Sequence, residues 1–536
     1  MTSRPDYQEF YAGFDANTLA NELDGDIASR INACVECCDR HVGQDRLALI
    51  WASANGERRT LTFEDLQAGS AKVANLLASH GVQPGDRVAG LLPRVPELVT
   101  LILGVLRMGA VYQPLFTAFG PQAIEHRLST SQAKLVVTDA ENRSKLDDLA
   151  NPPVILSLGG DGADLDYGAS VDAQSSDFEP VMRTGDQGLF LMSTSGTTGP
   201  PKGVSVPLRA LPALAAYMSF GLDLQSDDVF WNMADPGWAY GLYYAVIGPL
   251  LMGHQTILYD GPFTVEGVAA LIAELGVSNF ASAPTAYRAM MTSGPDTEHI
   301  LASNLRVASS AGEPLNPEVM RWFGEHADCD LFDQYGQTEV GMVMANHHGL
   351  RHDVSPGSAG VPMPGFALDV VDSDGKRLPP ATTGILAVDR TNSPLFFFDG
   401  YLGREGQDWV GDYYLTGDSV ERNEDGTFSF IGRSDDVISS SGYRIGPFEV
   451  ESSLLEHEAV AESAVVGKPD PERGEIVKAF VVLHPSYTGD SELAAQLQEH
   501  VRNRLSKHAY PREITFKDSL PKTPSGKIQR FILRNE

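Results

Sequence analysis

Residues 193–203 have the sequence Ser193-Thr194-Ser195-Gly196-Thr197-Thr198-Gly199-Pro200-Pro201-Lys202-Gly203. Five hydroxyl side chains, three glycines and one lysine follow the apolar run 188–192, which predicts a buried strand. Glycines let backbone N–H groups approach a ligand, hydroxyls add donors, and the lysine adds a positive charge. This composition predicts a loop that binds nucleotide phosphates, although it is not the P-loop pattern Gly-x-x-x-x-Gly-Lys-Ser/Thr. A surface linker is the alternative, which the preceding buried strand disfavours.

Length and charge restrict the class of protein. A chain of 536 residues is too long for one hydrophobic core, and 42% hydrophobic residues with 52 glycines are typical of a globular α/β enzyme. The net charge of −31 argues against nucleic acid as a partner. Within residues 502–534, however, nine basic residues stand against two acidic ones. This basic tail is a candidate site for a second anionic ligand, and a solvated helix face is the alternative.

No targeting signal is visible in the sequence. Residues 1–11 are polar, and no apolar run of about 18 residues occurs, so we expect no signal peptide, no membrane span and a cytoplasmic location. Three of the four cysteines, Cys34, Cys37 and Cys38, lie together, but a second Cys or His pair at zinc-binding spacing is missing. We therefore expect reduced thiols on an amphipathic helix.

Strand and helix patterns alternate along the first part of the chain. Strands are expected at 88–92, 110–115 and 134–138, with helices at 96–108 and 121–131 between them. Such alternation predicts a doubly wound parallel sheet. A second unit of the same type is expected from residue 228 onward, with strands at 256–259, 279–282 and 306–309.

Unusual loops are expected where these strands end, which is where open α/β sheets bind ligands. Besides 193–203 they are 234–241, 310–315 and 333–339. In the last of these, Tyr335 can stack on a purine, and Glu339 can hold Mg²⁺, a cation that prefers oxygen ligands.

The remainder of the chain predicts a β-rich subdomain and a separate small domain. Residues 357–432 are rich in short strands and glycines, and Asp418 is expected to close a strand, where its carboxylate suits ribose hydroxyls. The polar segment 432–447 indicates a domain boundary. We expect a large N-terminal domain over residues 1–434 and a small α+β domain over 435–536, with Lys527 on a constrained turn.

Together these motifs resemble the adenylate-forming superfamily in order, spacing and wording over nearly the whole chain. The residues that carry the resemblance are 193–203, 333–339, 414–418, 432–446 and 521–530. The wording at 441–447 and 470–475 is similar to the medium-chain and acetate branch of AMP-forming acyl-CoA synthetases. The resemblance implies that a carboxylate attacks the α-phosphate of ATP, giving an acyl-adenylate and pyrophosphate. The thiol of coenzyme A then attacks the acyl carbon and AMP leaves.

The resemblance also implies roles for individual residues. The phosphate loop would bind the β- and γ-phosphates, Thr338 the α-phosphate, and Glu339 the Mg²⁺. Lys527 would bridge the carboxylate and the α-phosphate, so Lys527, Glu339 and Thr338 are the expected catalytic residues. The expected ATP and AMP contacts are Thr194, Ser195, Gly196, Thr197, Thr198, Gly199, Lys202, Gly312, Glu313, Pro314, Asp333, Gln334, Tyr335, Gly336, Gln337, Thr338, Asp418, Arg433 and Arg444.

Two half-reactions at one site need different surroundings, and the family meets this need by swinging the small domain about a hinge. The hinge position matches Asp435 here. Lys527 would then leave the site and a coenzyme A channel would form against the basic tail. The expected coenzyme A contacts are Ser441, Gly442, Tyr443, Arg473, Arg502, Tyr510 and Arg512.

The acyl pocket is expected at Trp238, Gly312 and Gly336. Acetate-specific relatives have a tryptophan directly before the Gln-Thr-Glu wording, where this chain has Gly336. The missing indole predicts room for an acid longer than acetate. Trp238 would line or gate this pocket, and a core aromatic is the alternative.

The sequence therefore predicts an AMP-forming carboxylate–CoA ligase for a short-to-medium-chain acid, with ATP, Mg²⁺ and coenzyme A as its ligands. Three alternatives stay open: transfer to a carrier-protein thiol, a ligase specific for acetate or propionate, and a non-catalytic nucleotide-binding protein. Expected partners are these small molecules, without nucleic acid or a membrane span, and a homodimer is a conceivable assembly.

Overall fold

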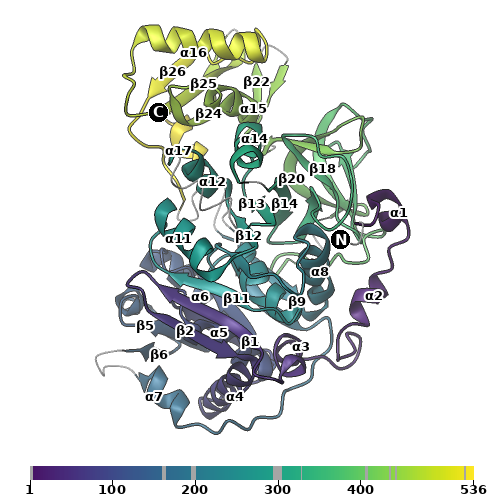
Figure 1. Cartoon of the computed structure of the whole chain (residues 1–536), viewed down its shortest axis with the longest axis vertical. Coiled ribbons are helices and arrows are strands. Elements are labelled where there is room, and N and C mark those ends of the chain that lie inside the picture. The colour runs from purple at the N-terminus through teal and green to yellow at the C-terminus, as the bar shows by residue number, and fades with distance from the viewer. Residues whose placement is uncertain are drawn as a thin grey trace.

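The computed structural model describes residues 4–159, 165–194, 201–293, 305–327, 329–404, 409–433, 436–440, 443–471, 473–523 and 527–536. Figure 1 shows a large body with the C-terminal part, in yellow-green, lying above it. The described strands form four sheets, three in the body and one in the C-terminal part.

The first sheet has seven strands in the order β7-β6-β5-β3-β4-β8-β9. Neighbouring strands are parallel except for β8 and β9, which pair as an antiparallel hairpin. The phosphate loop therefore connects two strands of a hairpin, whereas a P-loop leads into a helix. The bounds are β3 (Arg87–Leu91), β4 (Val111–Pro114), β5 (Leu135–Asp139), β6 (Val154–Leu158), β7 (Leu165–Asp166), β8 (Gly188–Ser193) and β9 (Gly203–Pro207).

The second sheet has 11 strands and combines the second α/β unit with the β-rich subdomain. Its first four strands are parallel, and the remaining pairs along the path are antiparallel. The strands, in spatial order, are β10 (Phe230–Asn232), β12 (Asn279–Ser282), β13 (Val307–Ala311), β14 (Leu331–Gln337), β15 (Gly341–Ala345), β16 (Ser358–Pro362), β21 (Phe428–Arg433), β20 (Tyr413–Arg422), β18 (Thr383–Asp389) and β17 (Ala367–Val371), with β19 (Trp409–Val410) on β20.

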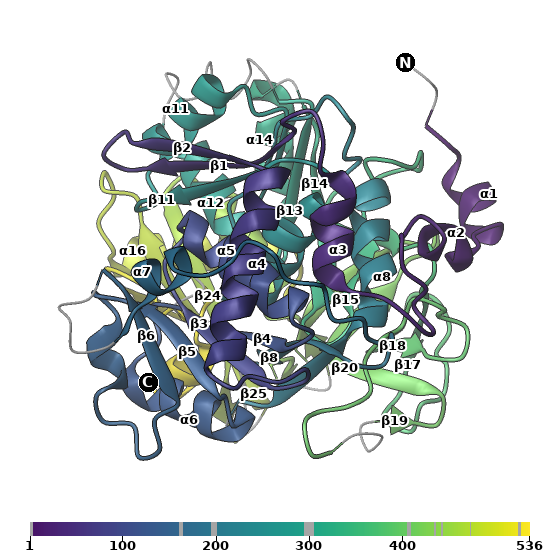
Figure 2. The same ribbon diagram turned by 90° about the horizontal axis from the view of Figure 1, so that it is seen from below.

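One expected strand belongs to a different sheet. The strand at 256–259 was predicted within the second α/β unit, but β11 (Thr256–Asp260) pairs in parallel with β1 (Leu47–Ser53). The latter forms a hairpin with β2 (Arg58–Thr62), so these three strands make a small separate sheet, visible in Figure 2. Trp51 of β1 is buried, and β1 pairs with one edge of β11.

The helices of the body cover the sheets. Figure 2 shows α4 and α5 side by side, and many of their residues meet in the largest apolar cluster. A capping box between Thr62 and Asp65 starts α4. The bounds are α1 (Tyr7–Ala12), α2 (Ala16–Ala20), α3 (Ala33–Cys37), η1 (Asp39–His41), α4 (Phe63–Ser79), α5 (Pro96–Arg107), α6 (Pro121–Ser131), η2 (Arg143–Leu146), α7 (Tyr167–Asp172), η3 (Leu208–Ala210), α8 (Leu211–Ala216), η4 (Tyr217–Gly221), α9 (Ala239–Gly241), η5 (Leu242–Ile247), α10 (Gly248–Leu251), α11 (Val265–Leu275), α12 (Pro284–Met291) and α14 (Pro317–His326).

The expectations about thiols and membranes can be compared with the described residues. Cys34 and Cys37 lie on the expected helix, α3, whereas Cys38 follows its last residue, and all four cysteines are buried free thiols. Among the described helices, none is both long enough and apolar enough to cross a membrane.

The C-terminal part is a small α+β unit with a hydrophobic core of its own. Its five-stranded sheet has the order β23-β22-β25-β24, with β26 on β25. Helix α15 packs on β24 and contacts both α14 and β21 of the body. The bounds are β22 (Ile438–Ser440), β23 (Tyr443–Ile445), α15 (Pro447–Leu455), β24 (Val460–Asp470), β25 (Gly474–Leu483), α16 (Ser491–Arg504), β26 (Glu513–Phe516) and α17 (Arg530–Arg534).

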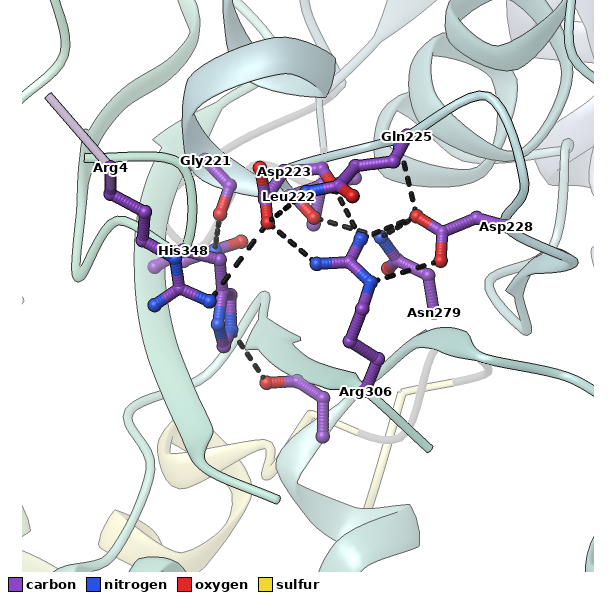
Figure 3. A network of polar contacts seen from close by, with 11 residues as sticks. Arg4, Gly221, Leu222, Asp223, Gln225, Asp228, Asn279, Arg306 and His348 are labelled. Carbon is purple, nitrogen blue, oxygen red and sulfur yellow. Dashed lines mark hydrogen bonds and ion pairs between the residues drawn. The ribbon is translucent and has the colours of Figure 1, made fainter. Parts of the chain in front are cut away.

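A buried polar network fixes the start of the parallel strands in the second sheet (Figure 3). Arg306, directly before β13, donates to Asp223 at 2.6 Å and forms a second ion pair with Asp228. Asn279 donates to the carbonyl of Leu222 at 2.8 Å, which ties β12 to the same turn. Burial alone would raise the pKa of Asp228, but hydrogen bonds led by those from Arg306 lower it below its usual range. The network thus holds β12 and β13 in place at the ends remote from their ligand-binding loops.

Candidate functional site

A cavity of about 700 Å³ lies between the second sheet and the C-terminal part. Its walls come from the segment after β13 and from β14, β20 and β21 on one side. On the other side they come from α15, β24, α17 and residues shortly before α17. Most of the expected nucleotide residues that the structure describes meet here. Those lining the cavity are Thr194, Gly312, Glu313, Pro314, Asp333, Gln334, Tyr335, Gly336, Gln337, Thr338, Glu339, Asp418, Arg433 and Lys527.

Of the residues expected to contact ATP or AMP, Asp333, Gln334 and Tyr335 lie within β14 rather than in a loop after it. This strand pairs with β13 on one side and β15 on the other, and its register shifts between Tyr335 and Gly336. Asp333 is 6% exposed, and burial raises the pKa of its carboxyl to about 8. One carboxyl oxygen accepts from the Leu315 N–H at 3.1 Å, while the other has no protein partner in the described chain. That oxygen is available to an amino group of a base.

Two π-helical segments, η4 and η5, form hydrogen bonds with β14 and with the residue that follows it. In η4, Tyr217 donates to the side chain of Gln334, which in turn donates to the carbonyl of Gly221 at 3.0 Å. In η5, Tyr243 donates to the carbonyl of Thr338 at 3.1 Å. The Gln334 amide is thus held by the protein, and we expect mainly its backbone to face a nucleotide.

Asp418 is the centre of a hydrogen-bond network beside the cavity. It was expected to close a strand but lies inside β20, and it accepts from the Tyr335 hydroxyl and from Gln337 Nε2 at 2.8 Å. Arg433 Nη1 lies 3.3 Å from the same carboxylate. Burial raises the pKa of Asp418, and Arg433, Tyr335, Gln337 and Lys527 oppose this rise. The Asp418 carboxylate still has hydrogen-bond acceptor capacity beyond these partners, so it can accept hydrogen bonds from two neighbouring hydroxyl groups.

Glu339 is the candidate metal ligand. Its side chain is buried, which raises its pKa, and Oε1 accepts from the Tyr401 hydroxyl at 2.9 Å. Within the described residues, no group of three or more His, Cys, Asp or Glu side chains could hold a metal ion. One carboxylate without a protein cage fits Mg²⁺, which keeps several waters and shares its remaining ligands with substrate phosphates.

Lys527 reaches the same cavity from the C-terminal part. Its carbonyl accepts from the Thr523 N–H at 2.7 Å, and its N–H donates to the Thr523 hydroxyl at 3.0 Å. These two bonds join the residues on either side of 524–526, which lie outside the described part of the chain, so the constrained turn stays a prediction. Lys527 lies near enough to Asp418 to lower the pKa of that carboxyl.

Several expected residues lie outside the part of the chain that can be described. They are Ser195, Gly196, Thr197, Thr198, Gly199, Asp435, Ser441 and Gly442, together with the side chain of Arg444. Lys202 is described but does not line the cavity, and its ammonium lies 4.3 Å from the centre of the Tyr401 ring.

The expected acyl-pocket residues are not all gathered at the cavity. Trp238 is absent from its lining and packs against Phe116 and Phe119, with ring centres 5.4 and 5.3 Å away. Gly312 lines the cavity, and a Cβ there would meet no atom within 4 Å. Gly336 also lines it, but its Cβ would lie 2.4 Å from the Gly341 oxygen. The room expected from the missing indole is therefore absent in the direction of a Cβ, because β15 occupies it.

None of the described residues expected to contact coenzyme A lines the cavity. Tyr443 is 49% exposed and stacks on His508 at 3.9 Å. Tyr510 lies two residues after His508. The guanidinium groups of Arg512 and Arg502 lie 4.9 and 5.9 Å from the centre of the Tyr510 ring. These groups form a basic and aromatic surface of the C-terminal part. The backbone N–H of Arg473 is held by Asp470 at the turn between β24 and β25.

The cavity also contains residues that the sequence did not indicate. Phe430 lies 6.3 Å from Tyr335 between ring centres, and Arg288 pairs with Glu313 at 3.3 Å. Asn316 donates to Ser452 of the C-terminal part at 2.8 Å. Phe430 and Arg288 lie in elements outside the expected motifs, so no local pattern identified them, whereas Asn316 directly follows the expected loop 310–315. The missed lining residues with polar or aromatic side chains include Arg288, Asn316, Tyr401, Phe430, Glu451 and Arg530.

Comparisons with known proteins agree with this arrangement. The family described as AMP-binding enzyme matches residues 38–402, and the AMP-binding enzyme C-terminal domain matches residues 449–527. The acetyl-coenzyme A synthetase of Bacillus subtilis is 37% identical over 98% of this chain and 94% of that protein. The mitochondrial acyl-coenzyme A synthetase ACSM3 of Mus musculus is 37% identical over 91% of this chain and 86% of that protein.

Solved structures show the same similarity. The acyl-CoA synthetase of Brucella canis has a TM-score of 0.81 and 55% identity, covering 99% of this chain and 98% of that one. The anthranilate CoA ligase AuaEII, solved with anthranoyl-AMP, has a TM-score of 0.88 and 27% identity, covering 97% and 98%.

These matches confirm the resemblance found in the sequence and the mixed α/β fold with its large N-terminal and small C-terminal parts. They also confirm the expected enzyme class, an AMP-forming acid–thiol ligase. The chain belongs to the family of AMP-binding enzymes.

Proposed function

We propose that the chain is an ATP-dependent carboxylate–CoA ligase that forms an acyl-adenylate and then an acyl-CoA thioester from a short-to-medium-chain acid. The observation that supports this best is the 700 Å³ cavity, where Asp418, Glu339 and Lys527 come together from three parts of the chain. Around this cavity, Asp418 can accept hydrogen bonds from hydroxyl groups, Glu339 can bind a metal ion, and Lys527 supplies a positive charge on a long side chain.

In the first half-reaction, a carboxylate oxygen bonds to the α-phosphorus of ATP and the bond to the pyrophosphate oxygen breaks. Asp333 and Tyr335 hold the base, and Asp418 with Arg433 holds the ribose. Lys527 places its ammonium between the carboxylate and the α-phosphate, which offsets their mutual repulsion and aligns them. Glu339 and the nucleotide would hold Mg²⁺, which neutralises charge on the phosphates.

In the second half-reaction, the thiol sulfur of coenzyme A bonds to the acyl carbon, AMP leaves, and the thiol proton passes to solvent. The surface around Tyr443, Tyr510 and Arg512 supports coenzyme A binding because it combines aromatic rings with positive charge. We propose that the C-terminal domain, residues 435–536, turns about Asp435 to bring this surface to the site and to carry Lys527 away. The two family matches end at 402 and begin at 449, on either side of that boundary.

The identity of the acid is the least constrained part of the proposal. Relatives are named for acetyl-CoA and acyl-CoA synthesis, and one structural neighbour for anthranilate. A panel of acids from acetate to octanoate, with branched, sulfur-containing and aryl acids, should be offered with ATP and Mg²⁺. Pyrophosphate is measured with and without coenzyme A, and the thioester by mass spectrometry.

Four outcomes of the panel discriminate between the alternatives. Turnover that depends on coenzyme A and peaks above acetate supports the proposal, whereas a peak at acetate or propionate replaces only the substrate class. Pyrophosphate release without a thioester would instead indicate a carrier-protein acceptor. Absence of pyrophosphate with every acid would refute the ligase. The cytoplasmic location and the homodimer also stay proposals, tested by fractionation and by light scattering.

A further inference from the structure

We propose that Tyr401 is a positioning residue that joins the two halves of the ATP–Mg²⁺ site. Its hydroxyl orients the Glu339 carboxylate, and its ring holds the Lys202 ammonium. This inference rests on the proposed function, because it assigns Tyr401 a task in binding the metal–nucleotide complex.

The backbone around Tyr401 is tied to the strand that follows the phosphate loop. Tyr401 forms an isolated antiparallel bridge with Val204, and the Leu402 N–H donates to the Gly203 carbonyl at 2.8 Å. Gly203 is the first residue of β9, and Lys202 directly precedes it. The segment that carries Tyr401 is therefore fixed to the end of the phosphate loop, although about 200 residues separate them in sequence.

The side chain of Tyr401 points to the metal ligand. Its hydroxyl donates to Glu339 Oε1 at 2.9 Å, and the residue lines the cavity. Its ring packs on Phe398 with centres 5.2 Å apart, which limits rotation away from this position. A hydrogen bond to one carboxylate oxygen leaves the other to a cation and fixes the orientation of the group.

The ring face of the same tyrosine holds the phosphate-loop lysine. Lys202 Nζ lies 4.3 Å from the ring centre, within the range of a cation–π interaction. No ion pair within 4.0 Å joins Lys202 to Glu339, both of which are described residues. A direct pair would neutralise both charges and would have to break before ATP and Mg²⁺ could bind. Because the ring contacts the cation and the hydroxyl contacts the carboxylate, Tyr401 holds both groups while leaving them available to phosphates and metal.

The competing explanation is that Tyr401 merely fills the core beside Phe398. Two variants separate these readings. Tyr401→Phe keeps the ring and removes the hydroxyl, whereas Tyr401→Leu removes both. Tyr413→Phe is the matched control, because its hydroxyl also donates to a carboxylate, Asp369 Oδ2 at 2.8 Å, but it does not line the cavity.

The main readout is metal binding without turnover. Mn²⁺ replaces Mg²⁺, a non-hydrolysable ATP analogue is added, and free Mn²⁺ is measured by electron paramagnetic resonance. We expect Tyr401→Phe to weaken Mn²⁺ binding roughly tenfold, as is typical when a partner of a metal ligand is removed. The dissociation constant of the analogue should change little. Tyr401→Leu should also weaken binding of the ATP analogue, by about threefold to tenfold, because the cation–π contact with Lys202 is lost.

A double variant tests whether the ring acts through Lys202. In a Lys202→Ala background, Tyr401→Leu should weaken the analogue no further than Lys202→Ala alone. Tyr413→Phe should match the wild type in both dissociation constants, and thermal melting shows that each variant is folded.

Several results would overturn the inference. If Tyr401→Phe binds Mn²⁺ as tightly as the wild type, the hydroxyl has no role in metal binding. If the effects of Tyr401→Leu and Lys202→Ala on analogue binding are fully additive, the ring does not act through Lys202. A fall in melting temperature with unchanged binding would leave Tyr401 a packing residue. If the wild type forms no acyl-adenylate in the acid panel, the proposed function fails. The binding measurements still decide the role of Tyr401, because they need no turnover.

Discussion

The ion pair between Arg530 and Glu451 should control the position of Lys527. Arg530 begins α17, three residues after Lys527, and its guanidinium donates to both oxygens of Glu451 at 2.8 Å. The side chains of Arg530 and Glu451 are only 24% and 7% exposed. Glu451 also accepts from the Val465 N–H at 2.8 Å. The pair thus ties the Lys527 turn to α15 and β24.

Removing one partner leaves the other buried and unpaired. Breaking a fully buried pair costs about 3–5 kcal/mol, and the partial exposure of Arg530 favours the lower limit, about 3 kcal/mol. Because roughly 1.4 kcal/mol corresponds to a factor of ten, Arg530→Met should disfavour the docked turn by about 10²-fold. Adenylation should fall by up to that factor. Thioester formation from supplied acyl-AMP should change much less, since Lys527 is proposed to act only in the first step.

The assay combines ATP–pyrophosphate exchange, acyl-AMP plus coenzyme A turnover, and urea unfolding. Glu451→Gln should resemble Arg530→Met, because the guanidinium then lacks its anion. A double Glu451→Met, Arg530→Met variant should lose less than the two single effects added together, since it leaves no unpaired charge. Equal losses in both half-reactions, or strict additivity, would refute the reasoning.

Three further predictions follow from single positions. Lys527→Ala should abolish pyrophosphate exchange but spare thioester formation from acyl-AMP, and parallel losses would contradict two separate arrangements. Gly336→Ala should destabilise the fold by about 1–3 kcal/mol through overpacking, whereas Gly312→Ala meets no atom and should show only backbone strain at φ +101°; equal urea midpoints would contradict the steric argument. Asp333→Asn should stabilise the nucleotide-free protein. Burial raises the pKa of the Asp333 carboxyl from its ordinary 3.8 to about 8, so wild-type stability falls as pH rises between those values. The gain should therefore grow from pH 5 to pH 9, with an upper limit of roughly 6 kcal/mol, and a pH-independent difference in urea unfolding would count against it.

The structure changes what we expect of a tryptophan at position 336. The sequence suggested that a tryptophan there would narrow the pocket and favour acetate. Because the Cβ direction points to Gly341 and Met342 of β15, Gly336→Trp should disturb the pairing of β14 and β15. We expect lower stability with no gain in acetate preference. The acid panel applied to a folded Gly336→Trp variant would decide between the two views.

Local sequence patterns were sufficient for much of the fold. Apolar periodicity predicted β3, β4 and β5, and the apolar run 188–192 predicted β8. Both depend on neighbouring residues, which set strand burial and turn geometry. The constrained turn expected at Lys527 stays a prediction, because residues 524–526 lie outside the described part of the chain.

Pairings between distant elements were not predictable in this way. The strand at 256–259 has an ordinary apolar pattern, which does not specify whether its partner is β1 or β12. Asp418 was expected to close a strand, yet β18 and β21 pair with its strand on both sides. Tyr401 carries no motif at all, and its importance arises from contacts with Lys202 and Glu339.

The roles proposed for groups on the C-terminal part require two arrangements of that part, one for each half-reaction. Lys527 lines the cavity, whereas Tyr443, Tyr510 and Arg512 lie on a surface that does not. All of these residues belong to one small unit with its own core, so they cannot exchange places by side-chain motion alone. If both groups act at the same acyl-adenylate, the unit must reorient as a body. The Asn316–Ser452 hydrogen bond and the contact of α15 with β21 would then have to break in each cycle. These contacts are polar or small, as expected for an interface that opens repeatedly rather than for a permanent core.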